Sequence, residues 1–178
     1  MSKNVLIIGG SPRKDGNSEL LCKEFARGAE TAGNHVEYIS LSGKKIGFCV
    51  ACYACEKGCC PQKDDAFPII EKMLAADVLV LATPVYFYTM SAQLKALIDR
   101  SVMVYPKIEK KDFYYIMTMA DTDRNNFTGT IEALRGFAEC CEGSRECGVL
   151  EAPGVYQKGE VLETAAFKES YQMGLSIQ

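Results

Sequence analysis

The chain has 178 residues, of which 48% are hydrophobic and 24% are charged. This composition is typical of a globular protein, and it excludes a disordered chain, a fibre and a low-complexity scaffold. Twenty basic residues stand against twenty-three acidic ones, which gives a net charge of −3. Nucleic-acid-binding proteins usually carry a basic excess, so we expect no nucleic-acid partner. Because a domain has roughly 150 residues, we expect one domain over residues 1–178.

The longest apolar runs, at 5–8 and 78–82, have the length of strands. Both are far shorter than the roughly 18 residues of a membrane span, so we expect no membrane partner. The first run begins almost at the amino terminus, which leaves no room for a signal peptide and favours a cytoplasmic protein. The nine cysteines are too few for a disulfide scaffold and odd in number. In a reducing compartment they would be thiols, metal ligands or redox groups.

Strand and helix patterns alternate along the chain. Continuous apolar runs predict strands buried on both faces, and apolar residues three or four apart predict amphipathic helices. We expect strands at 5–8, 36–41, 78–82, 113–118 and 148–152, and helices at 18–32, 69–76, 91–104, 128–141 and 164–177. The second strand is the most polar and suits a sheet edge. This alternation predicts an α/β fold with a doubly wound five-stranded parallel sheet.

In doubly wound sheets, ligands bind beyond the carboxyl ends of the strands, where the strand order switches. The loop at 9–18 follows the first strand and opens a helix, so its free N–H groups and the helix dipole favour an anion. It is neither a Walker A loop, since Asn17 replaces the lysine, nor a dinucleotide fingerprint, since Ser11 replaces the second glycine. The simpler interpretation is a polar turn with Asn17 or Ser18 as the helix N-cap. Its place after the first strand favours a phosphate site.

Three segments together resemble a known family: Gly10-Ser11-Pro12-Arg13 with Asn17-Ser18, then 83–88, then 94–100. They are similar to flavodoxin-like NAD(P)H-dependent FMN reductases, which are related to iron–sulfur flavoproteins. The resemblance is strong over residues 3–104 and only topological beyond them. It implies a flavodoxin-like fold with FMN at the switch point. It implies that the phosphate binds to Ser11, Arg13, Asn17 (through its side-chain amide) and Ser18, with Pro12 in the same loop. It also implies that Thr83, Pro84, Val85, Tyr86 and Phe87 line the ring, with backbone N–H groups reaching its polar edge. The loop after the fourth strand carries no specific motif, and there we expect Ala120 and Asp121 to close over the ring.

Three consecutive aromatic residues at 86–88 form an unusual loop. They suit either a flat, amphipathic ligand or a contact with a neighbouring subunit. Together with the helix at 91–104 they would leave an apolar patch too large for a small monomer, so we expect a homodimer or a higher homo-oligomer. Asp99 and Arg100 match the family but are expected as an exposed helix pair outside the site. His35 is expected on the surface.

The implied function is an FMN-dependent oxidoreductase. It would take hydride from NAD(P)H and pass electrons to a flavin, a quinone or another small acceptor. Because the flavin carries the chemistry, we assign no catalytic acid or base to the protein. An electron carrier of the flavodoxin type is a rival, but such carriers are usually strongly acidic and the net charge here is only −3.

Five cysteines crowd into the segment 49–60. The spacing Cys49-x2-Cys52-x2-Cys55-x4-Cys60 is similar to the compact motif of iron–sulfur flavoproteins. Cys59 in place of Cys60 fits a ferredoxin spacing, although the proline follows Cys60. The segment could therefore hold an iron–sulfur cluster and make the protein an electron carrier, hold a structural zinc ion, or be a loop of reduced thiols. We expect FMN as the only tightly bound cofactor, and no metal.

Overall fold

The computed structural model describes residues 2–58 and 60–178. At its centre lies a five-stranded sheet formed by β1 (Asn4–Gly9), β2 (His35–Ser40), β3 (Val78–Pro84), β4 (Asp112–Thr118) and β5 (Arg145–Ala152). The strand order is β2-β1-β3-β4-β5, and every neighbouring pair is parallel. The predicted doubly wound parallel sheet is confirmed, with β2 at one edge.

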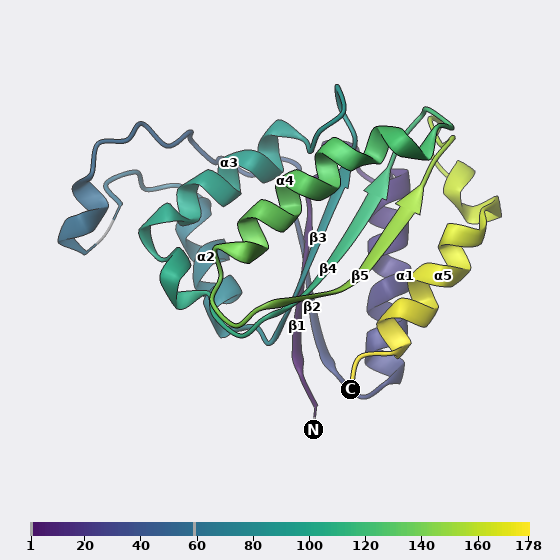
Figure 1. Cartoon of the computed structure of the whole chain (residues 1–178), viewed down its shortest axis with the longest axis horizontal. Coiled ribbons are helices and arrows are strands. Elements are labelled where there is room, and N and C mark those ends of the chain that lie inside the picture. Colours follow the sequence, from purple (N-terminus) through teal and green to yellow (C-terminus); the bar gives the residue numbers. More distant parts are fainter. Residues whose placement is uncertain (1, 59) are drawn as a thin grey trace.

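Helices cover both faces of this sheet (Figure 1). α1 (Asn17–Thr31) and α5 (Ala165–Leu175) lie on one face, and α2 (Ala66–Ala75), α3 (Ala92–Arg100) and α4 (Thr128–Glu139) lie on the other. The predicted helix at 91–104 ends earlier than expected, because the chain tightens into two short 3₁₀ turns after Arg100. The other elements agree with the prediction within a few residues. No helix in the described residues combines the length and apolarity that a membrane crossing needs.

The alternation of side chains along each strand builds two separate cores. In β1, Leu6 and Ile8 face the core under α2, α3 and α4, whereas Val5 and Ile7 face the core under α1 and α5. All four side chains are buried. A strand apolar at every position can be stable only with both faces covered, which explains why the run showed no polar alternation.

α1 and α5 cross at unusually close range. A Cβ atom on Gly28 would lie 2.1 Å from the carbonyl oxygen of Tyr171, and a Cβ atom on Gly174 would lie 2.1 Å from that of Phe25. Only glycine permits this approach of two backbones. Ser170 adds a hydrogen bond to the carbonyl of Leu21 at 2.8 Å. The carboxyl-terminal helix therefore fixes α1, whose amino end opens at the carboxyl edge of the sheet.

The strand order switches between β1 and β3. From β1 the chain passes to β2 on one side, while β3 lies on the other side and leads to β4 and β5. The loops that leave β1 and β3 therefore diverge and leave a crevice at the carboxyl edge of the sheet, the place where such folds bind ligands.

At the amino ends of the strands, opposite the crevice, Asp112 at the start of β4 accepts hydrogen bonds from Lys3 Nζ at 2.8 Å and Arg145 Nε at 2.6 Å. Burial would raise the pKa of this carboxyl, but the hydrogen bonds and charges of Arg145 and Lys3 outweigh it and lower the pKa to about 2. A carboxyl group with a lowered folded-state pKa stabilises the fold above its unfolded pKa, and this stabilisation is lost as the pH falls from about 4 to about 2.

We therefore predict that Asp112→Asn lowers the free energy of unfolding by up to about 2 kcal/mol at neutral pH. The difference from the unsubstituted protein will shrink as the pH is lowered below about 4. Urea unfolding between pH 7 and pH 3 measures this. Asp99→Asn, at an exposed carboxylate of α3, is the control. If Asp112→Asn lowers the free energy of unfolding equally across this pH range, the lowered pKa of Asp112 would be contradicted.

Candidate functional site

A cleft of about 180 Å³ lies at the switch point. Its walls come from the loops after β1, β3, β4 and β5. The lining residues are Ser11, Arg13, Gly16, Asn17, Ser18, Pro84, Val85, Tyr86, Thr118, Met119, Ala120, Val155 and Tyr156. Eight of the twelve residues predicted for cofactor binding are thus brought together around one cavity, from three separate loops.

The beginning of the loop after β1 is held through the backbone of Gly10. The N–H of Gly10 donates to Ala82 O at 2.7 Å, and Gly10 O accepts from Ser91 Oγ at 2.7 Å. A Cβ atom on Gly10 would approach both Ser91 Oγ and Leu94 Cβ to 2.9 Å. Glycine is needed here because the loops after β1 and β3 touch.

The start of α1 is the most anion-attracting part of the cleft. The N-cap is Gly16, which has no side chain to cap the first-turn N–H groups. Four N–H groups at a helix start have no intrahelical partner, and the helix dipole adds positive potential there. Ser11 Oγ, Ser18 Oγ and the guanidinium of Arg13 line the same cleft. The donor set therefore suits a phosphate group.

Two of these side chains also hold parts of the cleft together. Ser18 Oγ and Thr118 Oγ1 lie 2.7 Å apart, which joins α1 to the end of β4. Arg13 Nη1 donates to Tyr156 O at 2.8 Å, and its guanidinium lies 5.3 Å from the centre of the Tyr156 ring. The mouth of the cleft is thereby bridged from the loop after β1 to the loop after β5.

The loop after β3 supplies Pro84, Val85 and Tyr86 to the cleft. The N–H of Val85 donates to Thr118 O at 2.8 Å, and the N–H of Tyr86 donates to Thr89 O at 2.9 Å. These two N–H groups are therefore used within the protein. We had expected backbone N–H groups of this loop to meet the polar edge of a ring, but at these positions the loop offers side-chain contact instead.

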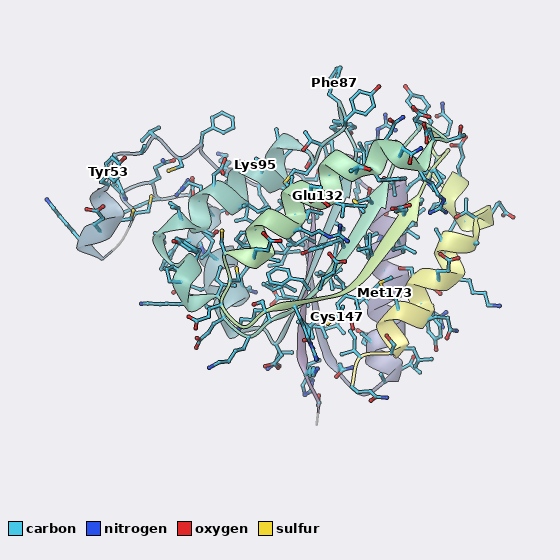
Figure 2. All side chains as sticks on the ribbon, in the orientation of Figure 1. Tyr53, Phe87, Lys95, Glu132, Cys147 and Met173 are labelled. Carbon is cyan, nitrogen blue, oxygen red and sulfur yellow. The ribbon has the colours of Figure 1, made fainter. Side chains whose placement is uncertain are left out.

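Four predicted residues lie outside the cleft lining. Pro12 is exposed, and Thr83 is buried, donating to Pro84 O at 2.8 Å and accepting from the N–H of Ser91 at 2.9 Å. Asp121 accepts from the N–H of Asp123 and from Asn126 Nδ2, which folds its own loop. Phe87 is 98% exposed and points into solvent at the tip of a turn (Figure 2).

Sequence reasoning missed the wall made by the loop after β5. Val155 and Tyr156 line the cleft, as do Thr118 and Met119 at the end of β4. The residues that the sequence predicts for the site all lie in the loops after the first, third and fourth strands. The available signal was that Val155 and Tyr156 follow closely on a strand in a parallel sheet, where all carboxyl ends share one edge. His35 is exposed at the start of β2, as expected.

The cysteine segment forms a second feature beyond α3 (Figures 1 and 2). Cys49, Cys52, Cys55 and Cys60 all line a cavity of about 390 Å³, together with apolar side chains such as Val102 and Met103. Cys59 lies outside the described residues. Among the described residues, no three His, Cys, Asp or Glu side chains are close enough to hold a metal ion. The donor type and spacing fit a cluster, whereas the arrangement in this structure does not form a ligand set.

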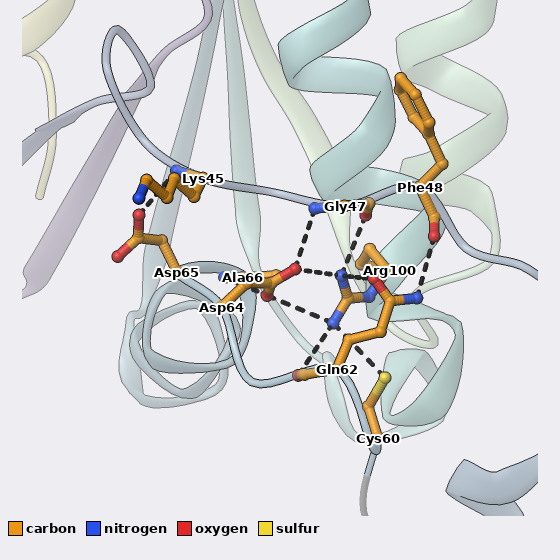
Figure 3. Close-up of polar contacts among 9 residues, drawn as sticks. All are labelled: Lys45, Gly47, Phe48, Cys60, Gln62, Asp64, Asp65, Ala66 and Arg100. Atoms are coloured by element: carbon orange, nitrogen blue, oxygen red, sulfur yellow. Dashed lines mark hydrogen bonds and ion pairs between the residues drawn. The ribbon is translucent and has the colours of Figure 1, made fainter.

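Arg100 closes the base of this segment (Figure 3). Arg100 is only 3% exposed, whereas Asp99 is exposed, so the expectation of an exposed pair is wrong for Arg100. Nη1 donates to Asp64 Oδ2 at 2.6 Å and to Gly47 O at 2.9 Å, and Nη2 lies 3.4 Å from Cys60 Sγ. Burial would raise the pKa of Asp64, but the hydrogen bonds from Arg100, Gly47 and Ala66 outweigh it, so the pKa lies below its usual range. One cation therefore joins both ends of the segment.

The family model of NADPH-dependent FMN reductases matches residues 3–129. The chain belongs to this family. The predicted family is confirmed, and FMN is the cofactor that goes with it.

Individual relatives are also similar to the chain, in sequence or in fold. An iron–sulfur flavoprotein of Methanocaldococcus jannaschii is 46% identical over 98 residues, 54% of this chain and 51% of the relative. An FMN-dependent NADH:quinone oxidoreductase of Methylorubrum extorquens is 33% identical over 103 residues, 58% of this chain and 40% of the relative. The chain thus spans about half the length, or less, of the curated relatives it matches. The solved structure of an NAD(P)H:quinone oxidoreductase from Methanothermobacter marburgensis shares the fold, with a TM-score of 0.77, 19% identity and coverage of 98% and 96%.

We predict that Arg100→Ala lowers the free energy of unfolding by roughly 2–3 kcal/mol, because it removes a buried side chain and leaves the half-buried carboxylate of Asp64 without its charged partner. Limited proteolysis will then cut within 48–60 faster than in the unsubstituted chain. Lys95→Ala, which removes an exposed ion pair with Asp99 on the same helix, is the control and should cost less than about 0.5 kcal/mol. Equal effects of the two substitutions would contradict the role of Arg100.

Proposed function

We propose that residues 1–178 act as a single FMN-dependent oxidoreductase domain, which takes hydride from NAD(P)H and passes electrons to a small acceptor such as a flavin or a quinone. The observation that carries this proposal is the cleft at the switch point, where an uncapped helix start meets two loops of apolar and aromatic side chains. Membership of the FMN reductase family supports it. So does the M. extorquens relative, whose name specifies FMN, NADH and quinone.

We propose that the phosphate of FMN binds at the start of α1. Ser11, Ser18, Arg13 and the N–H groups of the first helical turn are the donors. A phosphate at this place gains from both the unpaired N–H groups and the dipole. The hydroxyl of Ser18 would then share its contacts between Thr118 and the ligand.

The ring would lie against Pro84, Val85, Tyr86, Met119 and Ala120, which line the other part of the cleft. When bound, FMN supplies the hydride acceptor and the electron relay. The chain contributes binding and orientation: apolar surface for one side of the ring, and the partly exposed Tyr86 at the mouth. We propose that NAD(P)H and the acceptor enter from this open side in turn.

We also propose that the protein works in the cytoplasm. All eight cysteines among the described residues are free thiols, including exposed ones such as Cys49 and Cys147. Exposed thiols persist in reducing compartments and are oxidised elsewhere.

The first test concerns the phosphate donors. Replacing both Ser11 and Ser18 by Ala removes two hydroxyl donors, and each hydrogen bond to a charged group is worth about 1.5–3 kcal/mol. We expect FMN affinity to fall by at least about tenfold, measured by quenching of flavin fluorescence, with a smaller change for riboflavin, which lacks the phosphate.

The control for this test is Ser176→Ala, which removes an exposed hydroxyl at the end of α5 that donates to Met173 O. It should leave FMN affinity unchanged. A double variant that retains FMN as tightly as the unsubstituted protein would show that the phosphate binds elsewhere.

A second candidate function is that of an electron carrier with an iron–sulfur cluster on Cys49, Cys52, Cys55 and Cys60. Two observations favour it: the four thiols surround one cavity, and the M. jannaschii relative is named an iron–sulfur flavoprotein. Bound there, such a cluster would supply one-electron transfer. Under the main proposal, FMN is the only tightly bound cofactor.

One experiment on protein purified without oxygen separates the two candidates. We expect NADH or NADPH to bleach the flavin absorbance, and a quinone to restore it. Iron and acid-labile sulfide, measured on the same sample, are expected to be far below four per chain. If neither nucleotide bleaches the flavin, the reductase proposal fails. Four irons per chain, lost together in a Cys52→Ser, Cys55→Ser variant, would favour the electron carrier.

We further propose that the chain forms a homodimer or a higher homo-oligomer. The apolar face of α3 is buried against the core, and its exposed face carries Lys95 and Asp99, so this helix does not supply the apolar patch that we expected. Exposed apolar side chains lie instead in the turn at 86–89, such as Phe87, in or next to the cysteine segment, such as Tyr53 and Phe48, and just after α3, such as Val102 and Tyr105. An oligomer would cover such surfaces.

Sedimentation in solution without crosslinker tests the oligomer. We expect a species of at least two chains, and a shift toward the monomer for Phe87→Ser, because this side chain has no intramolecular packing to lose. Lys95→Ala on the exposed face of α3 is the control. A monomer at high protein concentration would contradict the proposal.

A further inference from the structure

Asn17 stands at the first position of α1, in the middle of the phosphate-site motif, yet its side chain is used elsewhere. Oδ1 accepts from the N–H of Gly159 at 3.1 Å and from the N–H of Val161 at 3.3 Å, and Nδ2 donates to Gln157 O at 2.8 Å. These partners fix which end of the amide is oxygen, since only a carbonyl oxygen accepts from two N–H groups. Both acceptor positions are filled, and one Nδ2 hydrogen is left over.

The partners of Asn17 belong to the segment that follows β5 and forms one wall of the cleft. This segment, residues 153–161, is joined to the loop after β4 at its beginning, where the N–H of Val155 donates to Met119 O at 2.9 Å. In its middle, Tyr156 O accepts from Arg13. At its end, Asn17 is the described side chain that hydrogen-bonds it to the start of α1, and Val161 is buried in the core beside that helix. Val155 and Tyr156, which line the cleft, lie between these attachments.

We propose that Asn17 is a positioning residue for the FMN site: its backbone lies at the phosphate, whereas its carboxamide holds the 153–161 segment so that Val155 and Tyr156 wall the cleft. This inference rests on the proposed function in one respect: FMN affinity can depend on the 153–161 segment only if FMN binds in the cleft. It replaces the expectation that the Asn17 side chain is itself a phosphate ligand. It also gives the segment after β5 a role in the site that the family motif at 10–18 does not reveal.

The first arm of the test needs no FMN. Amide hydrogen exchange at Gly159 and Val161 should become at least about tenfold faster in Asn17→Ala, because the acceptor of both N–H groups is gone. The matched control is Asn34→Ala. Asn34 is equally buried at 8% and also makes three backbone hydrogen bonds, with Lys3, Ala29 and Ile177. Asn34 lies at the other end of the strands, so Asn34→Ala should leave the hydrogen exchange at Gly159 and Val161 unchanged.

The second arm is a double-mutant cycle on FMN affinity with Asn17→Ala and Tyr156→Ala. If Asn17 acts through the segment, Asn17→Ala alone weakens FMN binding by about tenfold. In a chain that already carries Tyr156→Ala, the same substitution weakens FMN binding little further. Additive effects would mean that Asn17 contacts the ligand directly, and would overturn the proposal. Unchanged exchange at 159 and 161 would overturn it as well.

Two further outcomes are distinguishable. Should Asn17→Ala fail to fold, Asn17→Ser, whose shorter hydroxyl cannot span all three partners, gives the same direction of change in exchange, and no change would overturn the proposal. Should the unsubstituted protein bind no FMN, the proposed function fails, while the exchange arm still decides whether Asn17 holds the segment.

Discussion

The contact between Gly10 and Ser91 is the constraint on which the site depends. The two loops that diverge at the switch point meet here, with Ser91 Oγ donating to Gly10 O and the N–H of Gly10 donating to Ala82 O. No side chain fits between them, since a Cβ atom on Gly10 would lie 2.9 Å from two neighbours. The closeness of these backbones determines where α1 starts relative to β3, and with it the distance between the phosphate donors and the residues after β3.

α3 carries this constraint to the cysteine segment. Its first turn is capped by Ser91, which contacts Gly10, and its last residue is Arg100 at the base of the segment. A rigid helix of nine residues thus spans the two features. Arginine suits the far end because its planar fork reaches the carboxylate of Asp64, a backbone carbonyl and a thiol at once, which a lysine could not do. A buried charge of this kind stabilises little by itself but is costly to leave unpaired, so it defines one arrangement of the segment.

Most of the fold followed from the sequence for simple physical reasons. A strand buried on both faces must be apolar throughout, and β1 and β3 are. A helix that covers a sheet must repeat its apolar residues every three or four positions, as Leu21 and Phe25 do in α1. Arg100 was misjudged because its polar partners lie 36 to 53 positions earlier in the chain, and no local pattern reveals such a pair. The wall at Val155 and Tyr156 was missed for the same reason: the contacts that join it to the site, with Met119, Arg13 and Asn17, all reach residues far away in the chain.

The turn at 86–89 shows how a site can depart from local preference. Phe87 and Tyr88 have φ values of 49° and 65°, a conformation that a two-residue hairpin turn requires and that asparagine and glycine normally supply. For bulky residues this backbone conformation costs roughly 1–2 kcal/mol per residue. The turn is held closed by paired hydrogen bonds between Tyr86 and Thr89, and α4 makes room for it at Gly129, where a Cβ atom would lie 2.6 Å from Tyr88 O. Surrounding structure therefore imposes the strain, and its result is an aromatic side chain presented to solvent beside the cleft. The strained turn lowers the stability of the fold, and strain of this kind is typical of residues that contact a partner or a substrate.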